Sequence, residues 1–220
     1  MPIPLKYLAE FNENGIYHVY NRTNNREKLF LNDENRQFFL KKYYEHLTPY
    51  LDTFCWCLLP NHFHLLVRIK PLAVIQNSLN ATDPSKLSLT EKKFLKNEVL
   101  LGTLIGQSFK RFFQSYSLSF NKVHKRSGNL FYKPFKRIGV NKESQFTQTI
   151  IYIHANPLKH QIVKDFMTYK WSSWQSLLSD LPTSILRTEI LEWFGNKERL
   201  IQTHKELTQY YHECEVSIED

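Results

Sequence analysis

The sequence predicts an α+β fold, in which an antiparallel sheet is covered by helices on one face and followed by further helices. Three observations support this prediction. Short runs rich in β-branched and aromatic residues alternate with segments of helical periodicity. Two of these runs adjoin across Pro60-Asn61, a dipeptide typical of turns. No internal repeat or low-complexity tract interrupts the order.

The first half of the chain gives the order strand, helix, strand, strand. Residues 15–23 (GIYHVYNRT) predict a strand. A helix follows, capped by Asn32 or Asp33, because aromatic and leucine side chains recur at helical spacing up to residue 50. Residues 52–59 and 62–70 predict two strands joined as a hairpin.

The second half adds a helix, a strand and another helix. Residues 81–98 are polar and predict a surface insertion with a short helix, and residues 99–120 predict an amphipathic helix. Residues 130–140 predict a strand or extended segment. Ser144 is the expected cap of a helix that runs through Tyr152 and stops at Asn156-Pro157.

The resulting order, β-α-β-β-α-β followed by a helix, is that of a ferredoxin-like sandwich. We therefore predict one domain over residues 10–165. A C-terminal helical extension is expected over residues 166–220. Its end is acidic, with eight acidic against four basic residues from Arg187 to Asp220. That part of the extension is not expected to face phosphate.

Charge and composition narrow the function. The chain has 29 Lys and Arg against 21 Asp and Glu, a net charge of +8. This balance favours an anionic partner such as nucleic acid, although a basic protein without such a partner fits charge alone equally well. The N-terminus lacks the apolar core of a signal peptide, and Cys55, Cys57 and Cys214 cannot all pair within one chain. We therefore expect a reducing, cytoplasmic location.

Two histidines begin the second strand of the hairpin. Residues i and i+2 of a strand project from the same face, so His62 and His64 present two imidazoles side by side. Imidazole binds divalent metals. The alternative is two ordinary polar residues on a sheet surface. The apolar residues Leu65 to Val67 follow at once, and burial of imidazoles without partners is costly.

A second group of polar residues lies in IIYIHANP, residues 150–157. Tyr152 and Asn156 are four residues apart and so share one face of a helix. Tyr152 is a candidate nucleophile and Asn156 a candidate metal ligand through its amide oxygen. Alternatively, Tyr152 is an ordinary half-buried aromatic and Asn156 a helix-end residue before proline.

The third feature is a stretch from Val99 to Lys142 without any acidic residue. Cations neutralise phosphates, and aromatic side chains among them can stack on unpaired bases. Its aromatics at positions 109, 112 and 113 fit a hydrophobic core instead. The predicted DNA-binding residues are Arg22, Lys110, Arg111, Lys122, Lys125, Arg126, Lys133, Lys136 and Arg137.

Five segments in this order resemble single-tyrosine HUH transposases, most closely the REP-associated tyrosine transposases. They are YHVYNRTNNREKLF (17–30), CLLPNHFHLLV (57–67), FNKVHKRSGNLF (120–131), YIHANPLKH (152–160) and YKWSSW (169–174). The resemblance covers about residues 15–174.

This resemblance implies a ferredoxin-like fold and a DNA transposase. It implies His62 and His64 as ligands of Mg²⁺ or Mn²⁺, Asn156 as the third ligand and Tyr152 as the catalytic nucleophile. The implied activity is cleavage and rejoining of single-stranded DNA near a hairpin through a 5′-phosphotyrosine link. A bacterial, nucleoid-associated location and monomeric or homodimeric assembly are also implied.

Two other functions also fit the sequence. The first is a domesticated DNA- or RNA-binding protein on the same scaffold that no longer cleaves. The second is a metal-dependent hydrolase of small molecules, which the cationic stretch and the lack of Asp or Glu beside the histidine pair disfavour.

Overall fold

The computed structural model describes residues 4–213, and the side chains of all of these except residues 5 and 210–213. Cys214 and residues 215–220, which include Glu215, Glu219 and Asp220 of the acidic end, lie outside the described residues. The elements in chain order are η1 (Leu5–Tyr7), β1 (Ile16–Arg22), η2 (Asn24–Arg26), α1 (Asp33–Leu47), β2 (Leu51–Leu59), β3 (His62–Ile69), α2 (Leu72–Asn80), α3 (Leu89–Leu95), α4 (Leu101–Val123), β4 (Lys136–Gly139), α5 (Glu143–Lys159), η3 (Phe166–Thr168), α6 (Trp174–Leu178), α7 (Arg187–Phe194) and α8 (Lys197–Glu213).

The four strands form one antiparallel sheet in the order β2-β3-β1-β4. The two segments β1-α1-β2 and β3-α4-β4 are thus interleaved, which is the ferredoxin-like arrangement. The fold class predicted from the sequence is confirmed. In the described part of the chain, no helix has the length and apolar character that crossing a membrane requires.

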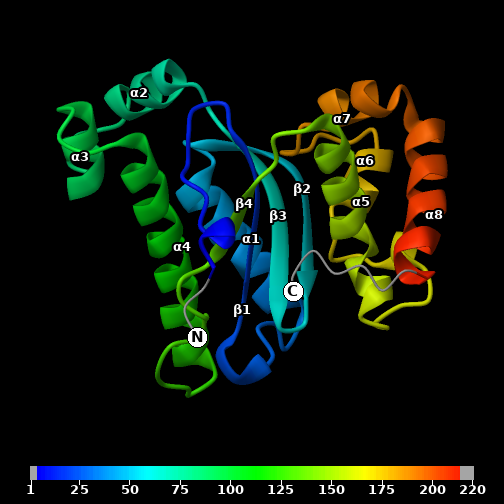
Figure 1. The fold of residues 1–220 in the computed structure, drawn as a ribbon. Helices are drawn as coiled ribbons and strands as arrows, with labels where there is room; N and C mark the ends of the chain where they lie inside the picture. Colours follow the sequence, from blue (N-terminus) through cyan, green and yellow to red (C-terminus); the bar gives the residue numbers. More distant parts are fainter. Residues whose placement is uncertain (1–3, 214–220) are drawn as a thin grey trace.

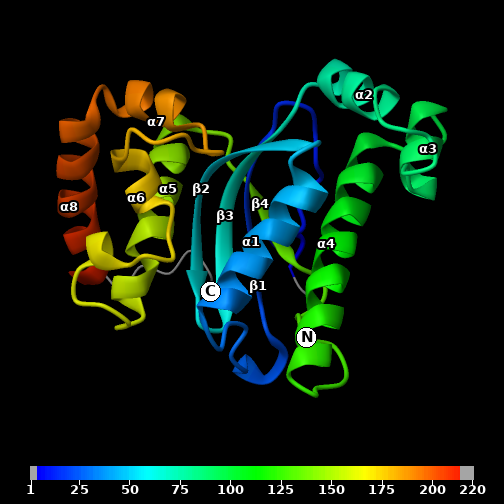
Figure 2. The ribbon, with the colours of Figure 1, turned by 180° about the vertical axis from the view of Figure 1, so that it is seen from behind.

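The sheet lies between two helical layers (Figure 1). Helices α1 and α4 cover one face, as the reverse view also shows (Figure 2). Helix α5 covers the other face, and α6, α7 and α8 lie beyond it. The helix that carries Tyr152 is therefore on the opposite side of the sheet from α1 and α4.

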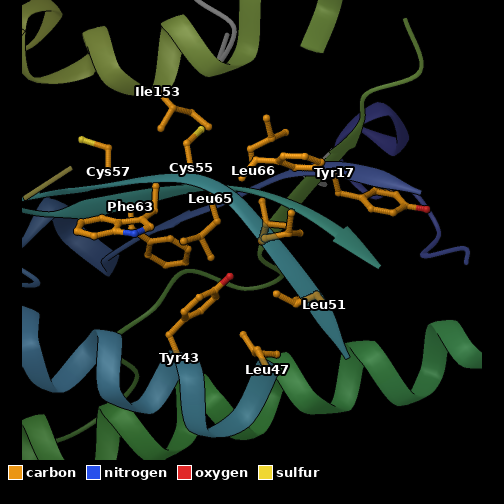
Figure 3. Close-up of a cluster of buried hydrophobic side chains, with 14 of the residues drawn as sticks. Tyr17, Tyr43, Leu47, Leu51, Cys55, Cys57, Phe63, Leu65, Leu66 and Ile153 are labelled. Atoms are coloured by element: carbon orange, nitrogen blue, oxygen red, sulfur yellow. The ribbon is translucent and has the colours of Figure 1, made fainter. Parts of the chain in front are cut away.

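Alternation along the strands divides the core between these two layers. Phe63 packs against Phe39 of α1 and Phe113 of α4, with ring centroids 5.0 and 5.8 Å apart. Figure 3 shows Cys55 and Leu66 on the opposite side, toward Ile153 of α5. Since successive strand residues point to opposite faces, His62 and His64 share the α5 side with Leu66.

Local sequence signals explain the most regular elements. The Asn32 side chain caps α1 by accepting a hydrogen bond from Asn35 N at 2.9 Å, as predicted. Asp33 and Glu34 occupy the first turn, where negative charge complements the helix dipole. The β2–β3 hairpin turns at residues 60–61, so register places Leu59 opposite His62.

Two expected boundaries are wrong. Helix α5 begins at Glu143 with Lys142 in the N-cap position, so Ser144 lies inside the helix rather than capping it. The same helix does not stop at Asn156-Pro157 but continues through Pro157 to Lys159. A proline near the end of a helix removes only one backbone N–H donor. The last turn still closes, because His160 N donates to Asn156 O at 3.0 Å. Helix α2, over Leu72–Asn80, was not predicted.

The segment 130–140 forms less strand than expected. Strand β4 is limited to Lys136–Gly139, while Phe131 makes an isolated bridge to Thr23. Pro134, which lies between them, has no N–H to donate to a ladder. The segment therefore reaches the end of β1 as a loop.

The C-terminal extension packs against β2, the edge strand. Leu58 N donates to Trp171 O at 2.8 Å, Ser173 N to Trp56 O at 2.9 Å and Leu186 N to Thr53 O at 2.8 Å. These bonds cover an edge that would otherwise present unpaired backbone groups. Trp174 is fully buried. The boundary at residue 165 remains a prediction.

Candidate functional site

The histidine pair lies in the middle layer of the molecule, on the face that α5 covers. Across the β1–β3 ladder, Tyr20 is opposite His64 and Arg22 is opposite His62. Because paired residues of antiparallel strands share a face, the side chains of β1 extend the same polar surface. His18 joins it two residues before Tyr20.

Hydrogen bonds fix the orientation of both rings. His64 Nδ1 lies 2.9 Å from His18 Nε2, and His62 Nδ1 lies 2.6 Å from Asn61 Oδ1. A carbonyl oxygen only accepts, so His62 Nδ1 carries the proton and Nε2 the lone pair. The bond to His18 holds His64 in the same way when His64 Nδ1 donates. Bonds of this kind orient histidines that bind metals.

Helix α5 aligns three polar side chains along these histidines. Tyr152, Asn156 and His160 occur at intervals of four residues and form one stripe. The Tyr152 ring stands edge-on to His64, with centroids 5.7 Å apart and an angle of 90°. The His160 ring lies 4.9 Å from that of His62. Asn156 lies between Tyr152 and His160 on this stripe.

Asn156 carries a polar atom that the fold does not satisfy. Its side chain is fully buried, and Nδ2 donates to Tyr152 O at 3.0 Å. Among the described residues, Oδ1 has no hydrogen-bond partner. Such a buried carbonyl costs on the order of 1–3 kcal/mol. Two imidazoles and an amide oxygen are donors that fit a divalent metal.

Two lysines place positive charge beside the tyrosines of the site. Lys159 Nζ lies 5.4 Å from the centroid of the Tyr152 ring. Lys136 Nζ lies 4.4 Å from the Tyr7 ring and 5.4 Å from the Tyr20 ring. Positive charge at these positions favours anionic groups, whether phenolate or phosphate.

The opposite side of α5 is held by a buried chain of hydrogen bonds. His204 Nδ1 donates to Leu200 O at 2.8 Å, so its Nε2 accepts from His154 Nδ1 at 3.1 Å. His154 Nε2 then accepts from Ser173 Oγ at 3.0 Å. Burial lowers the pKa of His154 well below its usual value and that of His204 to about 4, so both rings are neutral near pH 7.

Several of the predicted DNA-binding residues are engaged elsewhere in the fold. Arg111 Nη2 pairs with Glu91 at 2.8 Å and Arg126 Nε with Glu27 at 2.8 Å. Arg137 Nε donates to Ala9 O at 2.6 Å. Lys110, Lys122, Lys125 and Lys133 are exposed. A role of these residues in DNA binding stays a prediction.

The described residues contain no cluster of three or more His, Cys, Asp or Glu side chains that could hold a metal. A metal site at the histidine pair would therefore need the Asn156 oxygen in addition to the histidine nitrogens. Cys55 and Cys57 are buried free thiols, and burial raises the pKa of both well above its usual value. They are inert core residues.

Sequence reasoning did not single out His18, Tyr20, Lys159 or His160. The signal for the first two is the alternation in YHVYNR, which puts every second residue on the face of the histidine pair. The signal for the others is helical spacing, because Lys159 and His160 follow Asn156 by three and four residues. The first signal can be used only once the β1–β3 register is known, and the second only once the full length of α5 is known.

No family model matches the chain, and no curated protein matches it. Among solved structures, the chain is similar to a REP-associated tyrosine transposase bound to a REP hairpin, with 14% sequence identity and a TM-score of 0.47. The likeness covers 80% of this chain and 87% of that chain.

Proposed function

We propose that the protein is a metal-dependent HUH-type tyrosine transposase that cleaves and rejoins single-stranded DNA at hairpin-associated sites through a 5′-phosphotyrosine. One observation carries the proposal: the phenol of Tyr152 stands edge-on to His64, on the same helical stripe as the unsatisfied oxygen of Asn156. This arrangement supports Tyr152 of α5 as the proposed nucleophile, and His62 and His64 of β3 with Asn156 of α5 as the proposed ligands.

His62, His64 and Asn156 would hold the metal. Mn²⁺ suits two imidazole ligands better than Mg²⁺, which prefers oxygen. When bound, the metal polarises the scissile phosphate and offsets the charge that develops on it. The hydrogen bonds that His62 makes to Asn61 and His64 makes to His18 keep both rings aimed toward α5 and limit the reorganisation that binding requires.

Tyr152 would attack the phosphorus atom. The Tyr152 oxygen–phosphorus bond forms and the phosphorus–O3′ bond breaks; the phenol proton passes to solvent, and the departing 3′ oxygen takes one up. Free tyrosine has a pKa of about 10 and needs assistance to ionise. Lys159 supplies positive charge beside the ring. The covalent link conserves the phosphodiester energy for rejoining.

The test is to trap the covalent adduct. The full-length chain is incubated with Mn²⁺ and a hairpin DNA that has single-stranded flanks. We expect a species that resists denaturation, maps by mass spectrometry to Tyr152, and disappears in Tyr152→Phe and on removal of metal by chelation. Tyr20→Phe is a matched control, since Tyr20 is a second phenol near His64, with ring centroids 5.6 Å apart.

Three outcomes would contradict the proposal. An adduct that persists in Tyr152→Phe but disappears in Tyr20→Phe assigns the nucleophile to Tyr20. An adduct that forms equally without metal removes the role of the histidine pair. Tight hairpin binding by wild type without any adduct supports the alternative, a domesticated DNA- or RNA-binding protein that does not cleave.

A further inference from the structure

A small cationic cavity opens at the end of β1. It has a volume of about 300 Å³ and is lined by Arg22, Thr23, Asn25, Arg26 and Tyr132. Arg22 is the last residue of β1 and lies opposite His62 in the ladder. The cavity is therefore next to the position proposed for the scissile phosphate.

The walls of this cavity are fixed by hydrogen bonds between two distant segments. Tyr132 N donates to Arg22 O at 2.9 Å, and Asn21 Nδ2 donates to Tyr132 O at 3.0 Å. Asn24 N donates to Leu130 O at 3.0 Å. The end of β1 and the loop before β4 are thus held together, and the position of Tyr132 is preorganised.

Both arginines of the cavity are available to an anion. Among the side chains that the structure describes, neither Arg22 nor Arg26 forms an ion pair with a carboxylate. Glu27, the acidic residue adjacent in sequence, pairs with Arg126 instead. Two exposed guanidinium groups without acidic partners favour phosphate, which arginine binds through paired hydrogen bonds.

The aromatic wall is suited to a planar ring. Tyr132 is 39% exposed, although its backbone is fixed on both sides. The Arg22 guanidinium lies 5.7 Å from the centroid of its ring. Exposed aromatic side chains beside cations stack on unpaired bases. The volume is at the lower end of that of small-molecule sites, about 300–1,000 Å³, and limits the ligand to a small group.

We propose that this cavity binds one unpaired nucleotide of the DNA strand, with its base on Tyr132 and its phosphate against Arg22 and Arg26. The inference rests on the proposed function for its ligand. It adds a subsite that positions the strand through a nucleotide next to the cleaved bond, so that Tyr132 is a positioning residue and not a catalytic one.

The test combines an abasic scan with substitutions. Binding of the full-length chain to a fluorescent hairpin DNA is measured by anisotropy without metal, with one flanking nucleotide at a time made abasic. Loss of one stacked base should weaken binding by about 5- to 150-fold at a single position, the equivalent of about 1–3 kcal/mol. Tyr132→Ala should remove the difference between abasic and intact DNA at that position, and Tyr132→Phe should preserve it.

Arg26→Ala provides a second readout, because losing one phosphate contact should reduce the salt slope of binding by about one. Arg199→Ala is the matched control: Arg199 is also exposed but belongs to α8. Circular dichroism checks that each variant is folded. A scan in which no position matters, or a preference that Tyr132→Ala leaves intact, overturns the inference.

These outcomes are separate from those of the proposed function. If wild type forms the Tyr152 adduct but Tyr132→Ala and Arg26→Ala bind like wild type, the nucleotide subsite is wrong and the transposase proposal stands. If no adduct forms but the coupling between Tyr132 and one base is observed, the subsite stands and the cleavage reaction is wrong.

Discussion

His18 Nε2 and His64 Nδ1 lie 2.9 Å apart, and this contact between β1 and β3 sets the orientation of a candidate metal ligand. His18→Phe should lower Mn²⁺ affinity by about 10- to 100-fold, the usual effect of losing a partner that orients a ligand. His18→Gln, which keeps an acceptor, should lose less. Calorimetric titration of Mn²⁺ into metal-free protein measures both, and an unchanged affinity of His18→Phe contradicts the prediction.

The buried oxygen of Asn156, which has no hydrogen-bond partner among the described residues, should lower the stability of the metal-free protein. Asn156→Leu is close in shape and removes the buried oxygen that lacks a partner. We expect the metal-free variant to be as stable as wild type, or more stable by up to about 1 kcal/mol, because the lost bond to Tyr152 O is replaced by apolar packing. Its Mn²⁺ binding should be lost. Urea unfolding with and without Mn²⁺ tests this, and a loss above about 1 kcal/mol without metal refutes it.

The free energy of unfolding should depend on pH through His204. In the unfolded chain this ring takes up a proton near pH 6.5, whereas burial lowers its pKa in the folded protein to about 4. The unfolded state therefore binds more protons between these values, and stability falls as pH decreases from 6.5 to 4. For this group alone the loss is roughly 3 kcal/mol.

His204→Gln tests the source of this dependence. The amide cannot be protonated in this range but can accept the bond from His154 Nδ1. The variant should show a shallower decline in unfolding free energy between pH 6.5 and 4. An identical slope in wild type and variant would exclude His204 as the cause.

Trp174 should be essential to the packing of the C-terminal extension. It is fully buried and contacts His154 of α5 and His204 of α8, with ring centroids 5.5 and 4.7 Å away. Trp174→Ala should cost about 3–5 kcal/mol by leaving a cavity. Trp174→Phe should cost less, because it fills most of the space and removes an indole N–H that has no partner among the described residues. Denaturant unfolding of both variants distinguishes a packed extension from a loosely attached one, for which the two substitutions would be equally mild.

Much of the sheet was predictable because its signals are local. Alternation in YHVYNR and the turn residues of the hairpin define β1, β2 and β3, and the Asn32 cap defines the start of α1. The end of α5 was not predictable in this way. Pro157 is a helix-stopping signal, and only the packing of α5 on β2 and β3 shows that the helix continues to Lys159.

The candidate site was likewise predictable only where its residues belong to the same element. Spacing within one element placed His62 beside His64, and Tyr152 on the same face as Asn156. Contacts between elements were not predictable, because they depend on how the elements pair and pack: His18 contacts His64, His160 contacts His62, and Arg22 lies opposite His62. Tyr132 entered the site only because a loop folds back onto the end of β1.

Helix α5 has Tyr152 on one side and His154, two residues further along, on the other. The bond from His154 to His204 crosses 50 residues of sequence. Helix α5 is thus anchored through this bond to α8, the last described helix of the chain. A substitution in α8 that breaks this bond is therefore expected to shift α5, and with it the position of the Tyr152 ring beside His64.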